Sequence, residues 1–447
     1  MLMRDHIILK YADRRVPRYT SYPTAPNFSA EITATDYKSW LTALNPAEPA
    51  SLYLHVPYCR DMCWYCGCNT KATRQFGPVE RFSEILLKEI DLVAAELPAR
   101  MKVSHIHWGG GSPTYVRPQR FIEIMDRLKS RFDVAAAAEI AIEIDPRHFS
   151  QALADAFKTS GITRASLGVQ TFDEDVQAAV NRVQSADTVA QCVDLLRSAG
   201  VSGLNFDLIY GLPLQTVESC RMTAREALRF SLDRFSVFGY AHVPHFKAHQ
   251  RMIRDDDLPD VSSRLNQACA IAGELTQAGY IPIGLDHFAK PDDSLALAHA
   301  QRKVRRNFQG YTTDDAAAII GFGPSAVGWL PQGYVQNSPA TPDWERRIEA
   351  GELPIARGRR LTAEDRFRGE IIERLMCDLE ADIAAIAARH GFPQPESDFS
   401  AFIESGIVTA DASLVRVNRE YRPLVRNIAA VFDAYLLGST AQYSLAV

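Results

Sequence analysis

The sequence lacks a long hydrophobic run, an excess of basic charge and a dense set of disulfide-forming cysteines. Its longest nearly apolar stretch, residues 319–330, is too short and too rich in glycine to span a bilayer. The N-terminal segment has no long apolar region of the kind that a secretory signal requires. Lysine and arginine number 49 against 54 acidic residues, which disfavours nucleic acid as a partner. We therefore expect a cytoplasmic protein without membrane or nucleic-acid partners.

Residues 50–290 alternate between strand-like and helix-like patterns, of which the amphipathic helix at 78–97 is the clearest. Parallel strands need crossover helices, so this alternation predicts an α/β fold with a parallel sheet. Six such units suit an open or partial barrel, and an open doubly wound sheet is the alternative that periodicity leaves open. The predicted strands are 51–57, 103–108, 139–145, 164–170, 203–211 and 234–242.

Polar and glycine-rich residues gather at the carboxyl ends of these strands. The run GGGSPT (residues 109–114) follows the second strand, and Glu143, Gln170 and Asp207 lie late in the third, fourth and fifth. In parallel α/β folds this edge of the sheet carries the chemistry. The pattern therefore predicts an enzyme rather than a structural protein.

Outside this region the patterns differ. The first fifty residues look irregular. Beyond about residue 335 we expect helices near 362–389, 398–405 and 422–437 with a hairpin at 407–418, which resembles a small winged-helix-like domain. We expect three parts: an N-terminal extension (1–49), a catalytic domain (50–335) and a mainly helical C-terminal domain (336–447).

Four of the eight cysteines lie within ten residues. Cys59, Cys63 and Cys66 form a C-x3-C-x2-C pattern, and Cys68 follows two residues later. Three thiolates on a short loop can bind three irons of one [4Fe-4S] cluster and leave the fourth iron open to a substrate. Structural zinc usually takes two separated ligand pairs, and the sequence offers no second pair. The spacing therefore favours an iron–sulfur cluster over zinc or plain thiols.

The C-x3-C-x2-C pattern is the signature of the radical S-adenosylmethionine enzymes, and this sequence resembles them. Further motifs extend from about Arg18 to the C-terminus and resemble the oxygen-independent coproporphyrinogen III oxidase family. They are SLYLHVPYCRDMCWYCGCN, GGGSPT, EIDPR, SLGVQTF, NRVQ, FDLIYGLP, YAHVP, GLDHFAKPDD and RNFQGYTT.

The resemblance implies a partial (β/α)6 radical-SAM barrel with an N-terminal extension and the C-terminal domain. It implies oxidative decarboxylation of two propionates of coproporphyrinogen III to give protoporphyrinogen IX in haem biosynthesis, through a 5′-deoxyadenosyl radical. The implied cofactors are a [4Fe-4S] cluster and two molecules of S-adenosylmethionine. The implied partners are the substrate and an electron donor such as a flavodoxin-type reductant, and we expect a monomer.

The resemblance also assigns site residues, although it identifies no catalytic side chain. The implied cluster ligands are Cys59, Cys63 and Cys66, whereas Cys68 matches a cysteine that does not bind the cluster. For the first S-adenosylmethionine the matching residues are Tyr53, Tyr65, Gly110, Glu143 and Val327. For the second they are Gly111, Ser112, Gln170, Arg182, Asp207 and Ala241.

Each assignment has a plainer alternative. Arg182 is also compatible with a surface salt bridge, and Tyr53 with a core aromatic of its strand. Tyr65 and Ser112 depart from the phenylalanine and threonine common in the family. Glu143 and Asp207 are also compatible with a role as helix-capping residues at the ends of their strands.

The four propionates of the implied substrate need several cationic partners. Our hypothesis assigns this role to Arg15, Arg18, Lys303, Arg305 and Arg306. Two other functions stay open at this point. One is a haem chaperone of the same superfamily, although Cys68 favours the oxidase. The other is a winged-helix regulator with an iron–sulfur sensor, which the missing basic recognition helix disfavours.

Overall fold

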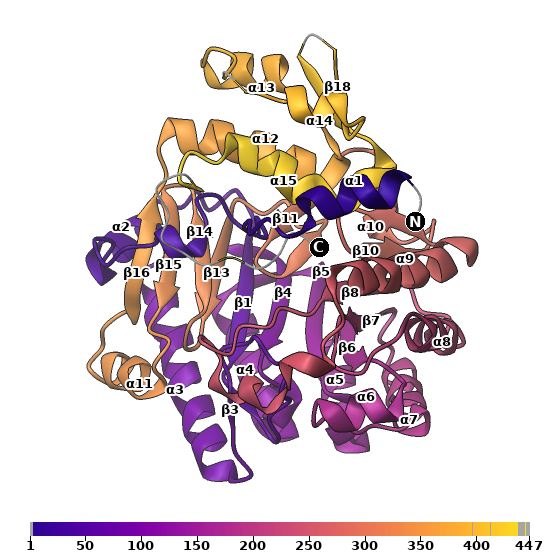
Figure 1. Ribbon diagram of the computed structural model, residues 1–447. Coiled ribbons are helices and arrows are strands. Elements are labelled where there is room, and N and C mark those ends of the chain that lie inside the picture. The colour runs from indigo at the N-terminus through magenta and orange to yellow at the C-terminus, as the bar shows by residue number, and fades with distance from the viewer. Residues whose placement is uncertain (1–2, 396, 412, 437–442, 444–447) are drawn as a thin grey trace.

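A single twelve-stranded sheet forms the frame of the molecule (Figure 1). The computed structural model describes residues 3–395, 397–411, 413–436 and 443. In order across the sheet the strands are β16 (Ile355–Arg360), β15 (Gly333–Asn337), β14 (Val327–Leu330), β13 (Ala318–Phe322), β1 (Ala50–Val56), β4 (Lys102–Gly110), β5 (Asp133–Ile144), β6 (Arg164–Gln170), β7 (Gly203–Tyr210), β8 (Arg234–Gly239), β10 (His287–Ala289) and β9 (Ile281–Ile283).

The six predicted strands are the central ones, and they lie side by side in chain order. β1, β4, β5, β6, β7 and β8 are all parallel to their neighbours. β1 is buried along almost its whole length, as expected for a parallel strand covered on both faces. The two edge strands, β16 and β9, do not pair with each other in the described part of the chain. The sheet is therefore open, and its six central strands run in chain order without the reversal of a doubly wound sheet, which confirms the partial α/β barrel.

Helices cover the sheet between successive strands. The predicted helix at 78–97 is α3, whose apolar face is fully buried in the main core. Ser150 caps α5, and Gly161 ends it in the left-handed region at φ 80°. The crossover helices are α3 (Phe76–Ala95), α4 (Pro118–Arg131), α5 (Gln151–Ser160), α6 (Glu174–Ala179), α7 (Ala186–Ser198), α8 (Val217–Leu228) and α9 (Val261–Gln277).

The parallel sheet is extended at both edges by antiparallel strands that the sequence patterns did not reveal. β13 pairs in parallel with β1, and β14, β15 and β16 follow it as an antiparallel meander. At the other edge, β9 and β10 form a short antiparallel hairpin that pairs with β8. The proposed boundary at residue 335 falls inside β15, and the division into three parts stays a prediction.

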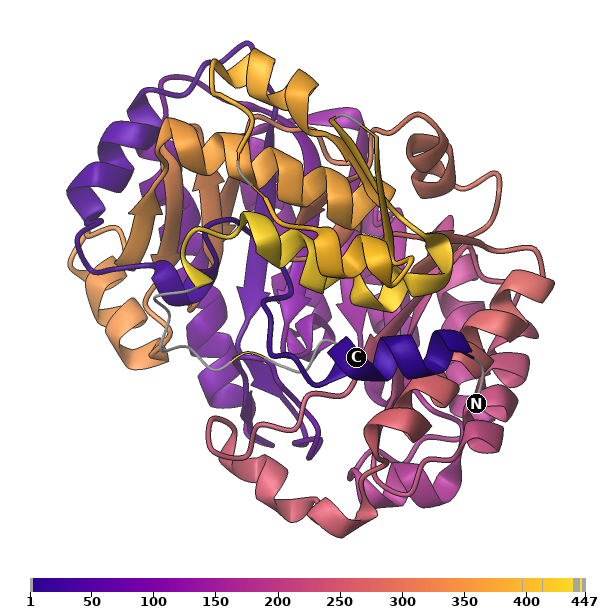
Figure 2. The same ribbon diagram turned by 45° about the horizontal axis from the view of Figure 1, so that its top comes forward.

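The N-terminal segment is more regular than expected. It contains α1 (Met3–Ala12) and α2 (Ala34–Thr42), so the expectation of an irregular segment was wrong for these residues. Ile8 and Tyr11 of α1 join the C-terminal core, whereas Trp40 of α2 joins the core under the sheet. Figures 1 and 2 show α1 (indigo) lying along the C-terminal helices.

The C-terminal region stacks helices over one end of the sheet (Figure 2). The helix predicted at 362–389 is broken, because Leu379 takes a left-handed φ of 60° between α12 and a short strand. The helix predicted at 422–437 is shorter than expected, and residue 437 lies outside the described residues. The hairpin predicted at 407–418 is confirmed as β18 and β19. The elements are α12 (Ala363–Asp378), β17 (Glu380–Asp382), α13 (Ile383–His390), α14 (Ser400–Glu404), β18 (Val408–Asp411), β19 (Leu414–Val417) and α15 (Val425–Ala429).

The remaining elements are short connections between these layers. Among the described residues, no helix has the length and apolar character needed to cross a membrane. The connecting elements are β2 (Tyr58–Cys59), β3 (Lys71–Ala72), α10 (Ser294–Ala300), β11 (Arg305–Asn307), β12 (Gly310–Thr312) and α11 (Thr341–Glu349).

Candidate functional site

The four clustered cysteines lie on a loop that leaves the carboxyl end of β1. The loop begins in β2, which pairs with β3, so that Cys59 stands opposite Ala72. Cys63 is buried, Cys59 and Cys66 are half-buried, and Cys68 is exposed. All four cysteines line the same small cavity, and Cys68 is the most exposed of them.

A cavity of about 160 Å³ lies between this loop and the carboxyl ends of the strands. It brings together most of the residues that the sequence assigned to cofactors. Those that line it are Cys59, Cys63, Cys66, Tyr65, Gly110, Gly111, Ser112, Glu143, Gln170, Arg182 and Asp207. The convergence of side chains from β4, β5, β6 and β7 follows from the parallel sheet, which ends all these strands at one edge.

The three thiols fit a cluster better than a single metal ion. In the described part of the chain, no group of three His, Cys, Asp or Glu side chains is arranged to hold one ion. A cubane needs a different arrangement, because each thiolate binds a separate iron. The amide of Cys68 also donates a hydrogen bond to Cys66 Sγ at 3.4 Å. The hydrogen bonds from Cys68 lower the pKa of Cys66 to about 6, which favours the thiolate that metals bind.

Two glycines at the end of β4 let the backbone pass close to the cysteine loop. A Cβ on Gly110, whose φ is 108°, would lie 2.6 Å from the ring of His55. A Cβ on Gly111 would lie 2.4 Å from Thr70 Oγ1 and 2.6 Å from the carbonyl oxygen of Tyr58. A side chain at Gly111 would push the cysteine loop away, and one at Gly110 would clash with His55 on β1. Packing therefore requires glycine at both positions, in addition to the turn that follows β4.

Two carboxylates face the cavity. Glu143 accepts a hydrogen bond from the amide of Gly110 at 3.1 Å, and His107 lies 3.4 Å from its other oxygen. Asp207 accepts a hydrogen bond from Asn205 at 2.9 Å. Burial, together with the charge of Glu143, raises the pKa of Asp207 to about 7. A cationic ligand bound between the two carboxyl groups would favour the ionised form of Asp207.

Gln170 holds a polar atom toward the cavity without a partner. Its Oε1 atom is buried and makes no hydrogen bond, and its backbone lies in the left-handed region at φ 69°. Buried polar atoms are almost always paired, and backbone strain at a non-glycine residue is uncommon. Both features fit a residue positioned for a ligand.

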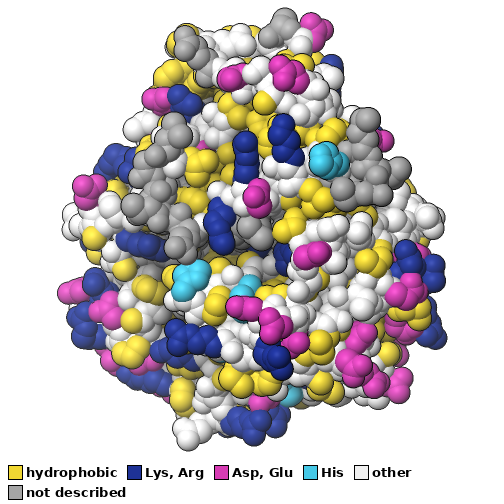
Figure 3. Space-filling view, in the orientation of Figure 1, with side chains coloured by type: hydrophobic (Ala, Val, Ile, Leu, Met, Phe, Trp, Pro, Cys, Tyr) yellow, Lys and Arg dark blue, Asp and Glu magenta, His cyan; other side chains and the backbone are white. Residues whose placement is uncertain are grey.

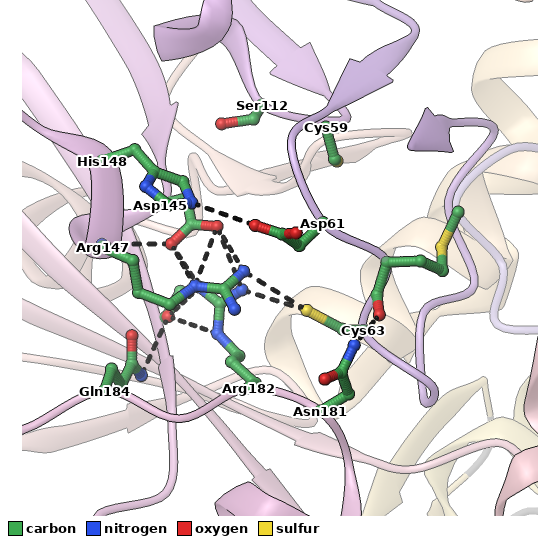
Figure 4. A network of polar contacts seen from close by, with 12 residues as sticks. Cys59, Asp61, Cys63, Ser112, Asp145, Arg147, His148, Asn181, Arg182 and Gln184 are labelled. Carbon is green, nitrogen blue, oxygen red and sulfur yellow. Dashed lines mark hydrogen bonds and ion pairs between the residues drawn. The ribbon is translucent and has the colours of Figure 1, made fainter. Parts of the chain in front are cut away.

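Arg182 is buried rather than part of a surface salt bridge (Figure 4). Its guanidinium lies 3.4 Å from Asp145, donates to the carbonyl oxygen of Gly168, and donates to Cys63 Sγ at 3.3 Å. Arg147 binds the same carboxylate at 2.6 Å. Burial alone would raise the pKa of Asp145, but the charges of Arg182 and Arg147 outweigh it and hold that pKa below its usual range. Asp145 and Arg147 belong to the EIDPR motif but were not assigned a role from the sequence.

Three assigned residues lie outside this cavity. The hydroxyl of Tyr53 lies 3.0 Å from His55 Nδ1, and its ring packs on His107. Val327 is on β14, beside Gly321 of β13, and Gly321 stands opposite Tyr53 on β1. Ala241 lines a second, larger cavity.

The larger cavity has a volume of about 780 Å³ and lies beside the ends of β7 and β8. Of the five cations that the sequence suggested for the substrate, Arg15, Arg18 and Arg306 line it. Lys303 and Arg305 do not, and Arg305 pairs with Glu373 at 3.1 Å on the outside. The cavity has four further arginines, which are Arg264, Arg419, Arg422 and Arg426.

The arginines in this cavity crowd one another. Burial, with the charges of neighbouring arginines, lowers the pKa of Arg422 to about 10 and that of Arg426 to about 9. Arg264 Nε and two nitrogens of Arg306 are buried without a hydrogen-bond partner. The seven arginines face three acidic residues, Asp260, Asp286 and Glu420. A sequence signal for part of this cluster was available. Three of its arginines are spaced so that they lie near one face of a helical segment, namely Arg419, Arg422 and Arg426.

Comparison with known proteins agrees with this geometry. Residues 53–227 match the Radical SAM superfamily. Over 451 aligned residues covering the whole of both chains, the protein is 51% identical to an oxygen-independent coproporphyrinogen III oxidase of Bradyrhizobium diazoefficiens. The chain belongs to the oxygen-independent coproporphyrinogen III oxidase family.

Other members of this oxidase family support the assignment. An oxygen-independent coproporphyrinogen III oxidase of Cereibacter sphaeroides is 41% identical over 95% of each chain. The solved structure of coproporphyrinogen III oxidase from Escherichia coli, described as a radical SAM enzyme, superposes with a TM-score of 0.88 at 36% identity. The superposition covers 95% of this chain and 100% of the other. The fold expected from the sequence resemblance is therefore confirmed over nearly its full length.

Proposed function

We propose that this protein decarboxylates two propionates of coproporphyrinogen III oxidatively, without oxygen, to give protoporphyrinogen IX in haem biosynthesis. The observation that carries the proposal is the position of an arginine-rich cavity beside the cysteine-lined one. β7 connects them, because Asp207 lines the smaller cavity and Tyr210 the larger. A polyanionic substrate in the larger cavity would lie next to cofactors in the smaller.

The smaller cavity has residues suited to a [4Fe-4S] cluster and S-adenosylmethionine. Cys59, Cys63 and Cys66 would hold the cluster. When both cofactors are bound, they supply a 5′-deoxyadenosyl radical. Glu143 and the glycine run would bind one S-adenosylmethionine, with Tyr53, Tyr65 and Val327 packing around it. The carboxylates would face the positive charges of the ligand.

We assign the second S-adenosylmethionine to Gly111, Ser112, Gln170, Arg182, Asp207 and Ala241. Gln170 supports this assignment through its unpartnered Oε1 atom. Ala241 supports it through its place on the larger cavity, since a ligand touching both Asp207 and Ala241 would extend from one cavity into the other. Arg182 already faces Asp145, so its role toward a ligand carboxylate would be shared with that residue.

The substrate assignment rests on charge. Seven arginines and three acidic residues line the larger cavity, which leaves an excess of four positive charges. This excess matches the four negative charges of the propionates of coproporphyrinogen III. Buried guanidinium groups without acceptors are costly, and carboxylates would satisfy them with strong, charge-assisted hydrogen bonds. The arginines would thereby fix the orientation of the tetrapyrrole, and the cavity walls would limit the access of water.

The proposal is tested by anaerobic turnover. Protein reconstituted with iron and sulfide receives dithionite, S-adenosylmethionine and coproporphyrinogen III. We expect 5′-deoxyadenosine and protoporphyrinogen IX, with two molecules of S-adenosylmethionine used for each product molecule. Haem binding without decarboxylation would instead indicate the haem chaperone, which the oxidase relatives disfavour. The flavodoxin-type donor, the monomeric state and the cytoplasmic location stay predictions.

A further inference from the structure

The segment between β8 and α9 crosses the outer side of the cysteine loop. Lys247 Nζ donates to the carbonyl oxygen of Cys68 at 2.8 Å, and His249 Nε2 donates to that of Cys66 at 2.8 Å. Gln250, in the same segment, donates to the carbonyl oxygen of Tyr65 at 3.0 Å. A protein that touched this segment would be separated from the cysteines by a single layer of side chains.

Positive charge surrounds this crossing. The surface named here the basic face consists of Arg60, Lys71, Arg74, Lys247 and Arg251. Lys71 stands opposite Tyr58 in the β2–β3 pair, directly beside Cys59. In the described part of the chain, Arg60, Lys71 and Arg251 form no ion pair within 4.0 Å. Their charges are therefore open to a partner.

Two large apolar side chains stand out of the same surface. Phe246 is 77% exposed and Met252 is 58% exposed, and both flank the residues that bind the cysteine loop. Figure 3 shows Lys and Arg side chains (dark blue) beside hydrophobic ones (yellow) in the lower front part of the molecule, where this segment runs in Figure 1, with acidic side chains (magenta) next to them. Exposed aromatic residues among charges of one sign are typical of protein–protein contact sites.

Acidic residues also lie near the basic face. Asp61 pairs with Arg74 at 2.7 Å inside it. Asp255 follows Met252 in the chain and pairs at 2.9 Å with His242, which lines the larger cavity. The basic face thus lies over the cysteine loop and ends before the substrate cavity.

We infer that the basic face is the docking site of an acidic one-electron donor protein of the flavodoxin type. The inference rests on the proposed function, in which the cluster must be reduced. Complementary charge would attract and orient the donor, and Phe246 would anchor it. The site lies on the side of the loop away from the smaller cavity, so a donor there leaves the cofactor and substrate cavities free.

The test measures cluster reduction in the reconstituted full-length protein by reduced flavodoxin, followed anaerobically by cluster absorbance without substrate. The variants are the double charge reversal Lys71→Glu/Arg251→Glu and, separately, Phe246→Ser. The matched control is Lys88→Glu/Arg229→Glu, which reverses two exposed cations on α3 and just after α8. Dithionite, a small reductant that needs no docking, checks that each cluster is intact.

We expect the double reversal to raise the KM for flavodoxin about tenfold and to weaken its dependence on salt, because salt screens an attraction to which two of the five cations no longer contribute. Phe246→Ser should raise the KM without changing the salt dependence. The control should behave as the parent protein. Flavodoxin kinetics that are unchanged in both the double reversal and Phe246→Ser would overturn the inference. Missing 5′-deoxyadenosine with dithionite would count against the proposed function instead.

Discussion

The Oδ1 atom of Asp145 lies 3.4 Å from the Nη2 atom of Arg182, and the same carboxylate binds Arg147 at 2.6 Å. One carboxylate, only 12% exposed, thus balances two guanidinium groups beside Cys63 (Figure 4). Asp145→Asn keeps the shape of the side chain but leaves both cations without a counter-charge. We expect it to lower the free energy of unfolding by about 3 kcal/mol, measured by denaturant titration.

The matched control for Asp145→Asn is Glu218→Gln, which breaks the exposed pair with Arg221. Exposed pairs contribute about 0–1 kcal/mol, so this variant should stay close to the parent protein. Equal losses in the two variants would contradict a special role for the buried network.

The roles of the clustered cysteines are separable. Cys59→Ser, Cys63→Ser and Cys66→Ser should each reduce iron content and abolish formation of 5′-deoxyadenosine, because each thiolate would bind a different iron. Cys68→Ser should retain the iron, since this cysteine is exposed at the far end of the loop. Iron analysis and visible absorbance after anaerobic reconstitution check this. Full iron content in a Cys63→Ser protein would refute the ligand assignment.

Because the end of β4 approaches the cysteine loop closely, we expect substitution of Gly111 to disturb that loop. In Gly111→Ala the new Cβ would lie 2.6 Å from the carbonyl oxygen of Tyr58, so the backbone beside Cys59 must shift. We expect most of the cluster to be lost although the protein still folds, as seen by iron content and circular dichroism. Gly77→Ala is the control, because a Cβ there meets nothing within 4 Å.

Substrate affinity should depend on the arginines that line the larger cavity. Arg306→Gln removes a charge whose Nε and Nη1 atoms are buried without partners. We expect the KM for coproporphyrinogen III to rise by about tenfold or more, the typical value of a charge-assisted hydrogen bond, with kcat little changed. Its neighbour Arg305 faces outward to Glu373, so Arg305→Gln should leave the KM unchanged. A similar KM in the two variants would place the substrate elsewhere.

Glu89 gives stability a dependence on pH. It is fully buried and accepts hydrogen bonds from the amide of Gly323 and from Asn337, both at 2.7 Å. Burial raises the pKa of Glu89 from 4.5 to about 8. The folded protein therefore binds this proton more tightly than the unfolded chain does. The stabilisation is fully present below about pH 4.5 and is lost as the pH rises through 8.

Comparison with Glu89→Gln tests this dependence. The variant cannot titrate at this position, so its unfolding free energy should fall less steeply than that of the parent protein between pH 5 and pH 8. The difference in slope decides the matter, because the amide itself changes the stability at every pH. Parallel curves for the two proteins would show that Glu89 stays ionised throughout.

The central fold and most of the site could be predicted because their signals are local. The six parallel strands are short segments in which apolar residues predominate or alternate with polar ones, and the cysteines and the glycine run directly follow two of them in the chain. The pairing of β13 with β1 could not be predicted. It brings Ala50 opposite Ala318, and the periodicity of a sequence does not indicate contacts between residues so far apart in the chain. The cavity-lining Arg264 could not be predicted, because in a sequence a single arginine looks the same whether it lies in a cavity or on a surface.

The position of β1 has a consequence for how the protein matures. One flank of β1 pairs with β4, which is synthesised soon after it. The other flank pairs with β13, at residues 318–322, which is synthesised much later. The thiols thus leave the ribosome well before the wall behind them exists. Synthesis must therefore pass residue 322 before β1 can be covered on both flanks and the cysteine loop can be held against a complete sheet.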